Sequence, residues 1–312
     1  MHSLDSLFIG SSTKDILMLV NAPPASDQRI AASYFTTACG GVSSTAAAAH
    51  QSLGGITGII TAVGDDDTSN FIRNDLQRQN FQYLKLFAIK DHYSSTSMIQ
   101  VEQDGRRCLT CFGGCIEKLT FPMIDKNILK SSRIIHLGVM NPETMLELCA
   151  YCKKHTEALI SIDGGNIPKD LALELLPYAD FYIPDNKTAM STLGLLPKEA
   201  CYFYVEKGAG FACVTSAESG SCACDGKNFY QEETIPVRVM DTTGAGDNFH
   251  GAFLYCINQG WDYGRSMRFS NIFASLSCEG LGGRAAIPPM EKVMGFMKNK
   301  AAVTPPHSLQ EI

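Results

Sequence analysis

Residues 241–253 read DTTGAGDNFHGAF, and this stretch is the most informative part of the chain for predicting its fold. A short extended run at 235–240 precedes it, and an apolar run at 249–257, compatible with a helix, follows it. Gly244 and Gly246 allow the backbone to turn tightly and to approach a ligand without a Cβ in the way. We therefore expect the amides of this turn at a helix N-terminus, where they can bind an anionic oxygen.

Asp247 lies in the same turn, which requires an explanation because a carboxylate repels a bound phosphate. One explanation is catalytic: the carboxylate accepts the proton of a hydroxyl group that attacks phosphorus. The structural alternative is that Asp247 caps the helix, a common role for aspartate. The residues of the turn alone leave both explanations open. In the catalytic explanation Asp247 is the general base, and the amides of Gly244, Ala245 and Gly246 form an anion hole.

Composition limits the class of protein and its partners. The chain has 312 residues, of which 45% are hydrophobic, and this is enough to bury the core of one large α/β domain. The net charge is −6 and no basic patch is visible, which argues against a nucleic-acid partner. No run of apolar residues is long enough to span a membrane, and the N-terminus lacks the basic start of a signal peptide. We therefore expect a cytoplasmic protein with no membrane partner.

The twelve cysteines do not form a recognisable metal-binding pattern. Cys108, Cys111 and Cys115 cluster in sequence, but a zinc or iron–sulfur site needs four convergent ligands. Cys149 and Cys152 have the spacing of a redox pair, yet they fall inside a helical run rather than at a helix N-terminus. We expect reduced thiols that pack as small apolar groups, with metal or redox use as the alternative.

Apolar strands and helices alternate along the chain, which predicts a mostly parallel sheet covered on both faces. Two β-rich segments near 16–35 and 93–112 interrupt this pattern and are expected to form a small lid. The tail at 301–312 contains two adjacent prolines and is expected to lack a fixed structure. The expected strands are 7–9, 16–20, 56–63, 93–101, 107–112, 134–139, 158–162, 181–183 and 213–215, with edge pieces at 222–224 and 228–231. The expected helices are 45–53, 68–79, 142–155, 170–176, 251–258, 263–278 and 290–298.

The thirteen residues at 241–253 resemble the signature of the ribokinase-like carbohydrate kinases, the PfkB family. The resemblance extends from about Leu7 to Pro288. It implies a three-layer α/β/α sandwich with a mostly parallel central sheet and a small β lid. The kinase domain would span 1–300, with the lid formed by about 12–38 and 93–113 and with 301–312 as a C-terminal tail.

The resemblance also implies a sugar-binding region in the first part of the chain. Asp15 matches an aspartate that accepts hydrogen bonds from sugar hydroxyls, a task for which a carboxylate is suited. Gly40 and Gly41 match a glycine pair that lines the sugar pocket. Many members carry asparagine where this chain has Thr45, so the sugar contact at that position differs here.

Nucleotide and metal sites are implied by the second part of the chain. Thr215, Ser216 and Gly220 match a nucleotide-binding loop in which Ala217 replaces a glycine, and Asn271 falls where the family borders the adenine. A glycine-to-alanine change is mild if the backbone angle φ is negative and unfavourable if it is positive.

The resemblance also implies two bound cations. Asp241 and Thr243 match residues around a monovalent cation, such as K⁺, in some members. ATP itself requires Mg²⁺. The family's magnesium-linked glutamate is replaced in this chain by Thr188 or Ala189.

The resemblance implies ATP-dependent phosphorylation of a primary hydroxyl on a small sugar or sugar derivative, and a homodimer formed through the β lid. A nucleoside kinase is one alternative, and a phosphosugar kinase is another. A non-catalytic sugar or nucleotide sensor is a third, motivated by Thr45, Ala217 and the missing glutamate. The candidate aromatic residues for a nucleoside slot are Tyr34, Phe35 and Phe112, and the candidate cations for a phosphosugar are Arg29, Lys90, Arg106 and Arg107.

Overall fold

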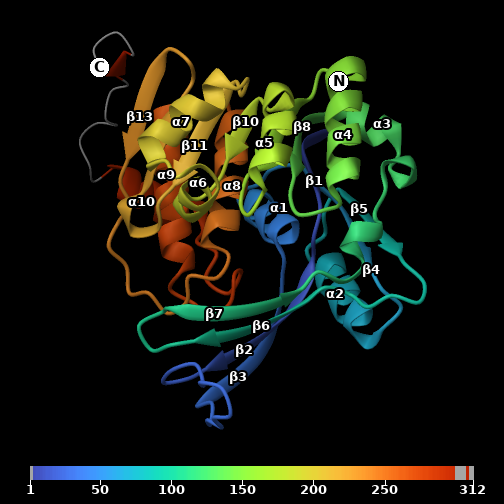
Figure 1. Ribbon diagram of the computed structural model, residues 1–312, viewed down its shortest axis with the longest axis vertical. Coiled ribbons are helices and arrows are strands. Elements are labelled where there is room, and N and C mark those ends of the chain that lie inside the picture. The colour runs from blue at the N-terminus through green and yellow to red at the C-terminus, as the bar shows by residue number, and fades with distance from the viewer. Residues whose placement is uncertain (1–2, 299–306, 309–312) are drawn as a thin grey trace.

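The computed structural model describes residues 3–298 and 307–308, and its centre is a ten-stranded sheet (Figure 1). Seven neighbouring strands are parallel, and three antiparallel strands extend one edge. In spatial order the strands are β5 (Tyr83–Ala88), β4 (Thr57–Val63), β1 (Leu4–Ile9), β8 (Ser132–Leu137), β9 (Leu159–Asp163), β10 (Phe181–Ile183), β11 (Phe211–Thr215), β12 (Ser221–Cys224), β13 (Asn228–Glu232) and β14 (His307–Ser308).

Helices cover both faces of this sheet, giving three layers. Strand β1 illustrates why, since Leu7 and Ile9 pack into the core on one face and Phe8 into the core on the other. The first core contains residues of α4, α5 and α7, and the second contains residues of α1, α2 and α8. The helices are α1 (Val42–Ser52), α2 (Asp67–Arg78), α3 (Lys126–Lys130), α4 (Pro142–His155), α5 (Lys169–Leu175), α6 (Asn186–Leu193), α7 (Pro197–Glu206), α8 (Ala245–Asn258), α9 (Tyr263–Ser277) and α10 (Met290–Lys298).

A second sheet of four strands lies beneath the main body as a lid (Figure 1). Its order is β3 (Tyr34–Gly40), β2 (Thr13–Leu19), β6 (Thr96–Val101) and β7 (Arg107–Phe112), and only the β2–β6 pair is parallel. We call the face that carries Asp15, Leu17 and Leu19 the site face, because Leu17 packs there against Leu281 of the main body. The opposite face, which carries Lys14, Ile16 and Met18, is the outer face.

The predicted fold class is confirmed, including the small β lid. The sequence did not reveal β3, β5, α6 or α7. Strand β5 lies at the sheet edge and buries no residue fully, while α6 and α7 are short, so their apolar patterns are weak. The extended run at 235–240 joins no strand; instead, the amide of Met240 donates to the carbonyl of Cys278 at 2.8 Å. The tail at 301–312 lies outside the described residues, except for β14.

All twelve cysteines are free thiols, and ten of them are buried. Cys108 and Cys111 are exposed on opposite faces of β7, so the cluster noted in the sequence does not converge on one point. Burial raises the pKa of Cys115 to about 11 and that of Cys152 to about 12. None of the described helices is long and apolar enough to cross a membrane.

Candidate active site

The N-terminus of α8 presents unpaired amides at the carboxyl edge of the sheet. Gly244 is the N-cap, with a left-handed φ of 73° that favours glycine, and a Cβ there would lie 2.7 Å from Gly283 Cα. The amide of Ala245 donates only a long hydrogen bond, of 3.3 Å, to the carbonyl of Thr242. The amides of Gly246 and Asp247 have no hydrogen-bond partner among the described residues. These groups are therefore available to an anion, as the sequence predicted.

Buried side chains fix the geometry of this turn. Asp241 is 1% exposed, and its carboxylate accepts hydrogen bonds from the amide and hydroxyl of Thr243 at 2.8 and 2.6 Å. Its second oxygen accepts from the amide of Gly282 at 2.8 Å. Asn248 Nδ2 donates to the carbonyl of Gly283 at 2.7 Å. Because two loops are joined in this way, the amides of the turn are preorganised rather than mobile.

Asp247 has the protonation behaviour expected of a general base. Burial raises the pKa of Asp247 to about 8, and the negative charges of Asp163 and Asp15 add to this rise. The positive charge of Arg107 opposes it. A base works best when its pKa lies near the pH of the reaction, and this carboxylate meets that condition.

Two further carboxylates, which were not among the predicted site residues, lie where neighbouring strands end at this edge of the sheet, and the charge of one of them, Asp163, acts on Asp247. Asp163 ends β9, and its Oδ1 accepts from the amide of Gly165 at 2.8 Å. Its Oδ2 lies 3.6 Å from His250 Nε2, and burial lowers the pKa of His250, so this histidine is neutral. Asp185 follows the neighbouring β10. A usable signal was available, because ligands bind where parallel strands end and both residues follow predicted strands.

Asp15 lies on β2 of the lid. It is 3% exposed and accepts a 2.8 Å bond from Thr13 Oγ1. Burial raises the pKa of Asp15, partly opposed by hydrogen bonds from Thr13 and Ser97 and by the charge of Arg284. A Cβ at Gly40 would overlap Asp15 Oδ2, so glycine is required at that position for this carboxylate to keep its place.

The predicted sugar-binding residues lie next to the anion hole. Gly41 is the N-cap of α1, with a φ of 97°, and α1 packs along α8. Thr45, in the first turn of α1, is buried, and its methyl group lies 3.2 Å from where a Cβ at Gly244 would be. The structure therefore brings the glycine pair, Thr45 and the N-terminus of α8 together.

The predicted nucleotide loop follows β11 at the same edge of the sheet. Thr215 ends the strand, and the amide of Ser216 donates to the carbonyl of Gly220 at 2.7 Å. Ala217 has a φ of 46°, which is the unfavourable case for the loss of a glycine. Thr215 also forms an isolated parallel bridge with Asp185, so this loop adjoins the flanking carboxylates.

Asn271 does not present the free amide expected of a nucleotide contact. It is buried on α9, and its Nδ2 donates to Ser221 Oγ at 3.0 Å and to the carbonyl of Glu232 at 2.9 Å. Both donor hydrogens are therefore used within the protein. The residue therefore supports the β12–β13 edge, and its contact with a nucleotide stays a prediction.

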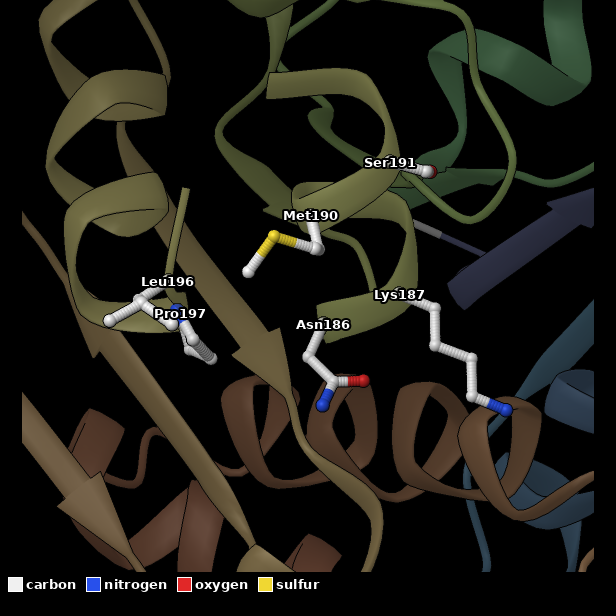
Figure 2. A pocket seen from close by; sticks show the side chains of 6 residues that line it. All are labelled: Asn186, Lys187, Met190, Ser191, Leu196 and Pro197. Carbon is white, nitrogen blue, oxygen red and sulfur yellow. The ribbon is translucent and has the colours of Figure 1, made fainter. Parts of the chain in front are cut away.

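A groove of about 450 Å³ lies along α6 and the start of α7, and its first lining residue, Asn186, follows Asp185 in the chain (Figure 2). Met190 and Lys187 extend in different directions from α6 in this view. The lining includes no carboxylate and no amide of the anion hole, so it does not carry the predicted chemistry. The lining residues are Asn186, Lys187, Met190, Ser191, Leu196 and Pro197.

Unpaired amides at a helix N-terminus, a carboxylate with a raised pKa beside them and a buried carboxylate on a lid are the features expected of a phosphoryl-transfer site. Comparison with known proteins gives the family. A sequence profile of the pfkB family carbohydrate kinases matches residues 5–290. The chain belongs to this family, whose members are ATP-dependent phosphotransferases.

Individual relatives resemble the chain over nearly its whole length. A ribokinase of Bacillus subtilis is 26% identical over 290 residues, which cover 91% of this chain and 96% of that protein. A deoxyribokinase of Salmonella typhi is 26% identical over 305 residues, which cover 94% of this chain and 99% of that protein. The structure of Arabidopsis thaliana ribokinase complexed with ribose and ATP superposes with a TM-score of 0.83. It is 21% identical and covers 96% of this chain and 100% of that one, so it confirms the fold.

Proposed function

We propose that this kinase transfers the γ-phosphoryl group of ATP to a primary hydroxyl of a small sugar or sugar derivative, with Asp247 as general base. The observation that carries the proposal is the α8 N-terminus, where the unpaired amides of Gly246 and Asp247 adjoin a carboxylate whose pKa is about 8. Asp15 and Gly40 supply a polyol-binding element in the same region. The similarity to a ribokinase and a deoxyribokinase supports a pentose as acceptor.

Each group has a defined part in the reaction. Asp15 and the Gly40–Gly41 turn hold the acceptor, and Asp247 removes the proton from the attacking hydroxyl. The new O–P bond forms as the bond between the γ-phosphorus and its bridging oxygen breaks, and ADP leaves. The amides of Gly244 to Gly246 stabilise the charge on the phosphoryl oxygens. Donors of this kind contribute about 2.7–4 kcal/mol each in other enzymes.

Magnesium fits the oxygen donors at the edge of the sheet. Asp163 ends β9 and Asp185 follows β10, and each uses one oxygen to accept a backbone amide. The second oxygen of Asp185 would be available to Mg²⁺ or its water, and that of Asp163, which lies 3.6 Å from His250 Nε2, could accept from a metal-bound water. The metal neutralises phosphate charge when bound. Thr188, which replaces the family's glutamate, is buried, and its hydroxyl accepts from the amide of Asn166, so it is not a ligand.

Potassium would lie between the turn at 241–243 and the loop at 282–284. The carboxylate of Asp241 already accepts three hydrogen bonds there, so it would act chiefly by fixing the loops, with Thr243 beside it. Omitting K⁺ from the assay, with Na⁺ in its place, tests this part of the proposal. An unchanged rate would remove potassium from it.

The lid favours a sugar over a nucleoside as acceptor. Phe35 and Phe112 lie on the outer face, in register with Met18 and Lys14, so they cannot stack on a base in the site. Tyr34 lies on the site face but is 55% exposed, at the far end of the sheet from Asp15.

The outer face of the lid supports the proposed homodimer. Phe35, Met98 and Phe112 are exposed there by 58, 49 and 55%, which is an unusual concentration of large apolar side chains. A second copy of the chain would bury them by pairing the two lids. Sedimentation equilibrium of wild type and of Met98→Lys tests this, and a monomeric wild type would contradict it.

A coupled ADP-release assay over pentoses, hexoses, ketoses, phosphosugars and nucleosides tests the proposed function. We expect turnover with a neutral sugar, and a phosphomonoester at its primary carbon by ³¹P NMR. The absence of acceptor-dependent ADP release would favour the non-catalytic sensor. Preference for a nucleoside would overturn the choice of acceptor while leaving the chemistry intact.

A further inference from the structure

Arg107 projects from the lid on the same face as the sugar-binding carboxylate. It pairs directly with Val101, which pairs in turn with Leu19, and directly paired residues share a face of the sheet. Val101 is fully buried and packs in the cluster that includes Leu281 of the main body. Arg107 is therefore on the site face of edge strand β7, where it is exposed.

The turn that joins β6 to β7, at the tip of the lid, brings Arg107 to the turn at 241–247. A Cβ at Gly105, two residues before Arg107, would lie 2.5 Å from Val239 Cγ1, so the tip rests on the segment that leads into Asp241. On the other side, Leu281 precedes Gly282, whose amide binds Asp241. Two independent contacts thus place the start of β7 over the turn at 241–247.

Arg107 is an unpaired cation in a site that is rich in negative charge. It has no ion pair or hydrogen bond among the described residues, whereas Arg284 is held by Asp75 at 2.9 Å. Burial raises the pKa of both Asp247 and Cys278, and in each case the charge of Arg107 opposes the rise. At Asp15 the opposing cation is Arg284 instead. Arg107 therefore faces the phosphoryl end of the site rather than the sugar end.

We propose that the Arg107 guanidinium contacts the oxygens of the phosphoryl group during transfer and is a catalytic residue supplied by the lid. This inference rests on the proposed kinase function. A guanidinium suits the task because it presents several donors in a plane and stays charged. It also offsets the repulsion between the triphosphate and the carboxylates of Asp247 and Asp163. In other phosphotransferases an arginine in this role contributes about 10³–10⁵ in rate.

The matched pair Arg107→Gln and Arg106→Gln tests the proposal. Arg106 lies in the same hairpin but is paired with Asp104 at 2.8 Å and Glu102 at 3.2 Å. With D-ribose and with each other neutral sugar that wild type phosphorylates, we expect R107Q to lower kcat by about 100-fold or more. We expect the acceptor KM to change by less than about threefold, and R106Q to match wild type. Thermal unfolding of all three proteins checks that the fold is retained.

Two results would overturn the assignment. Equal kcat values for R107Q and R106Q would remove Arg107 from the chemistry. A rise in KM confined to acidic acceptors would instead assign the arginine to an anionic group of the acceptor. If wild type phosphorylates no acceptor at all, the proposed function fails, and the next measurement still tests the arginine.

That measurement is calorimetric binding of MgADP with and without aluminium fluoride, a mimic of the transferring phosphoryl group. We expect R107Q to lose at least about tenfold in affinity for the fluoride complex while its affinity for MgADP alone changes by less than about twofold. An equal loss for both ligands would show that Arg107 binds the nucleotide in its ground state, against the proposal.

Discussion

Replacing Asp247 with asparagine should make the protein more stable at alkaline pH. Burial raises the pKa of Asp247 to about 8 in the folded protein, whereas the unfolded chain has the ordinary value of about 3.9. Between these values the folded state holds a proton that the unfolded state has released. The stability of the wild type therefore falls as pH rises through this window, because the charged carboxylate is disfavoured in the fold. Asparagine cannot ionise and escapes this loss.

The size of the effect follows from the shift. A difference of about four pKa units corresponds to about 5 kcal/mol at most. Asp247 retains some solvent access, so the effect should be smaller than this limit. We expect the difference in free energy of unfolding between Asp247→Asn and wild type to grow by about 2–5 kcal/mol as the pH rises from about 5 to about 9. Urea unfolding of the ligand-free proteins measures it, with the exposed loop variant Asp27→Asn as control. A stability difference that stays constant within about 0.5 kcal/mol across this range would show that the pKa of Asp247 is not raised by the fold.

Three further substitutions test separate parts of the site. Asp163→Asn should lower the pKa of Asp247, because among the neighbouring negative charges that of Asp163 raises this pKa most. The acidic limb of the pH profile of kcat/KM should then move to lower pH, and an unmoved limb would count against the coupling of the two carboxylates. Gly40→Ala should displace the Asp15 carboxylate and raise the acceptor KM by about tenfold or more, as measured by steady-state kinetics, with ATP binding unaffected. Ala217→Gly should stabilise the protein by about 1 kcal/mol in urea unfolding by relieving a positive φ, and a loss of stability would contradict this.

The sequence predicted the parts of the fold whose signals are local. The helices at 142–155 and 290–298 and the strand at 181–183 match the observed bounds, because their apolar periodicity and caps lie within each segment. Strand β3 was missed because its pattern is weak and it exists through pairing with β2. Helix α8 begins at Ala245, well before its apolar run, since the glycine-rich turn forms its first residues.

The candidate site divides in the same way. The position of Asp247 and of the turn's amides at a helix N-terminus was predictable, because one continuous motif carries them. Asp163 was not assigned, although it follows a predicted strand at the edge where ligands bind. Arg107 was named only as a candidate cation for a phosphosugar, because its place beside the turn at 241–247 depends on the register of the lid. The burial of Asn271 in its own hydrogen bonds also depends on a distant strand.

The most direct test of the central claim is a rapid-quench measurement of phosphoryl transfer by Asp247→Asn with ATP and a sugar that the wild type phosphorylates. We expect a rate at least about 100-fold below wild type, with sugar and ATP affinities unchanged within about threefold. A variant that keeps more than about a tenth of the wild-type rate would contradict the assignment of this carboxylate as the base.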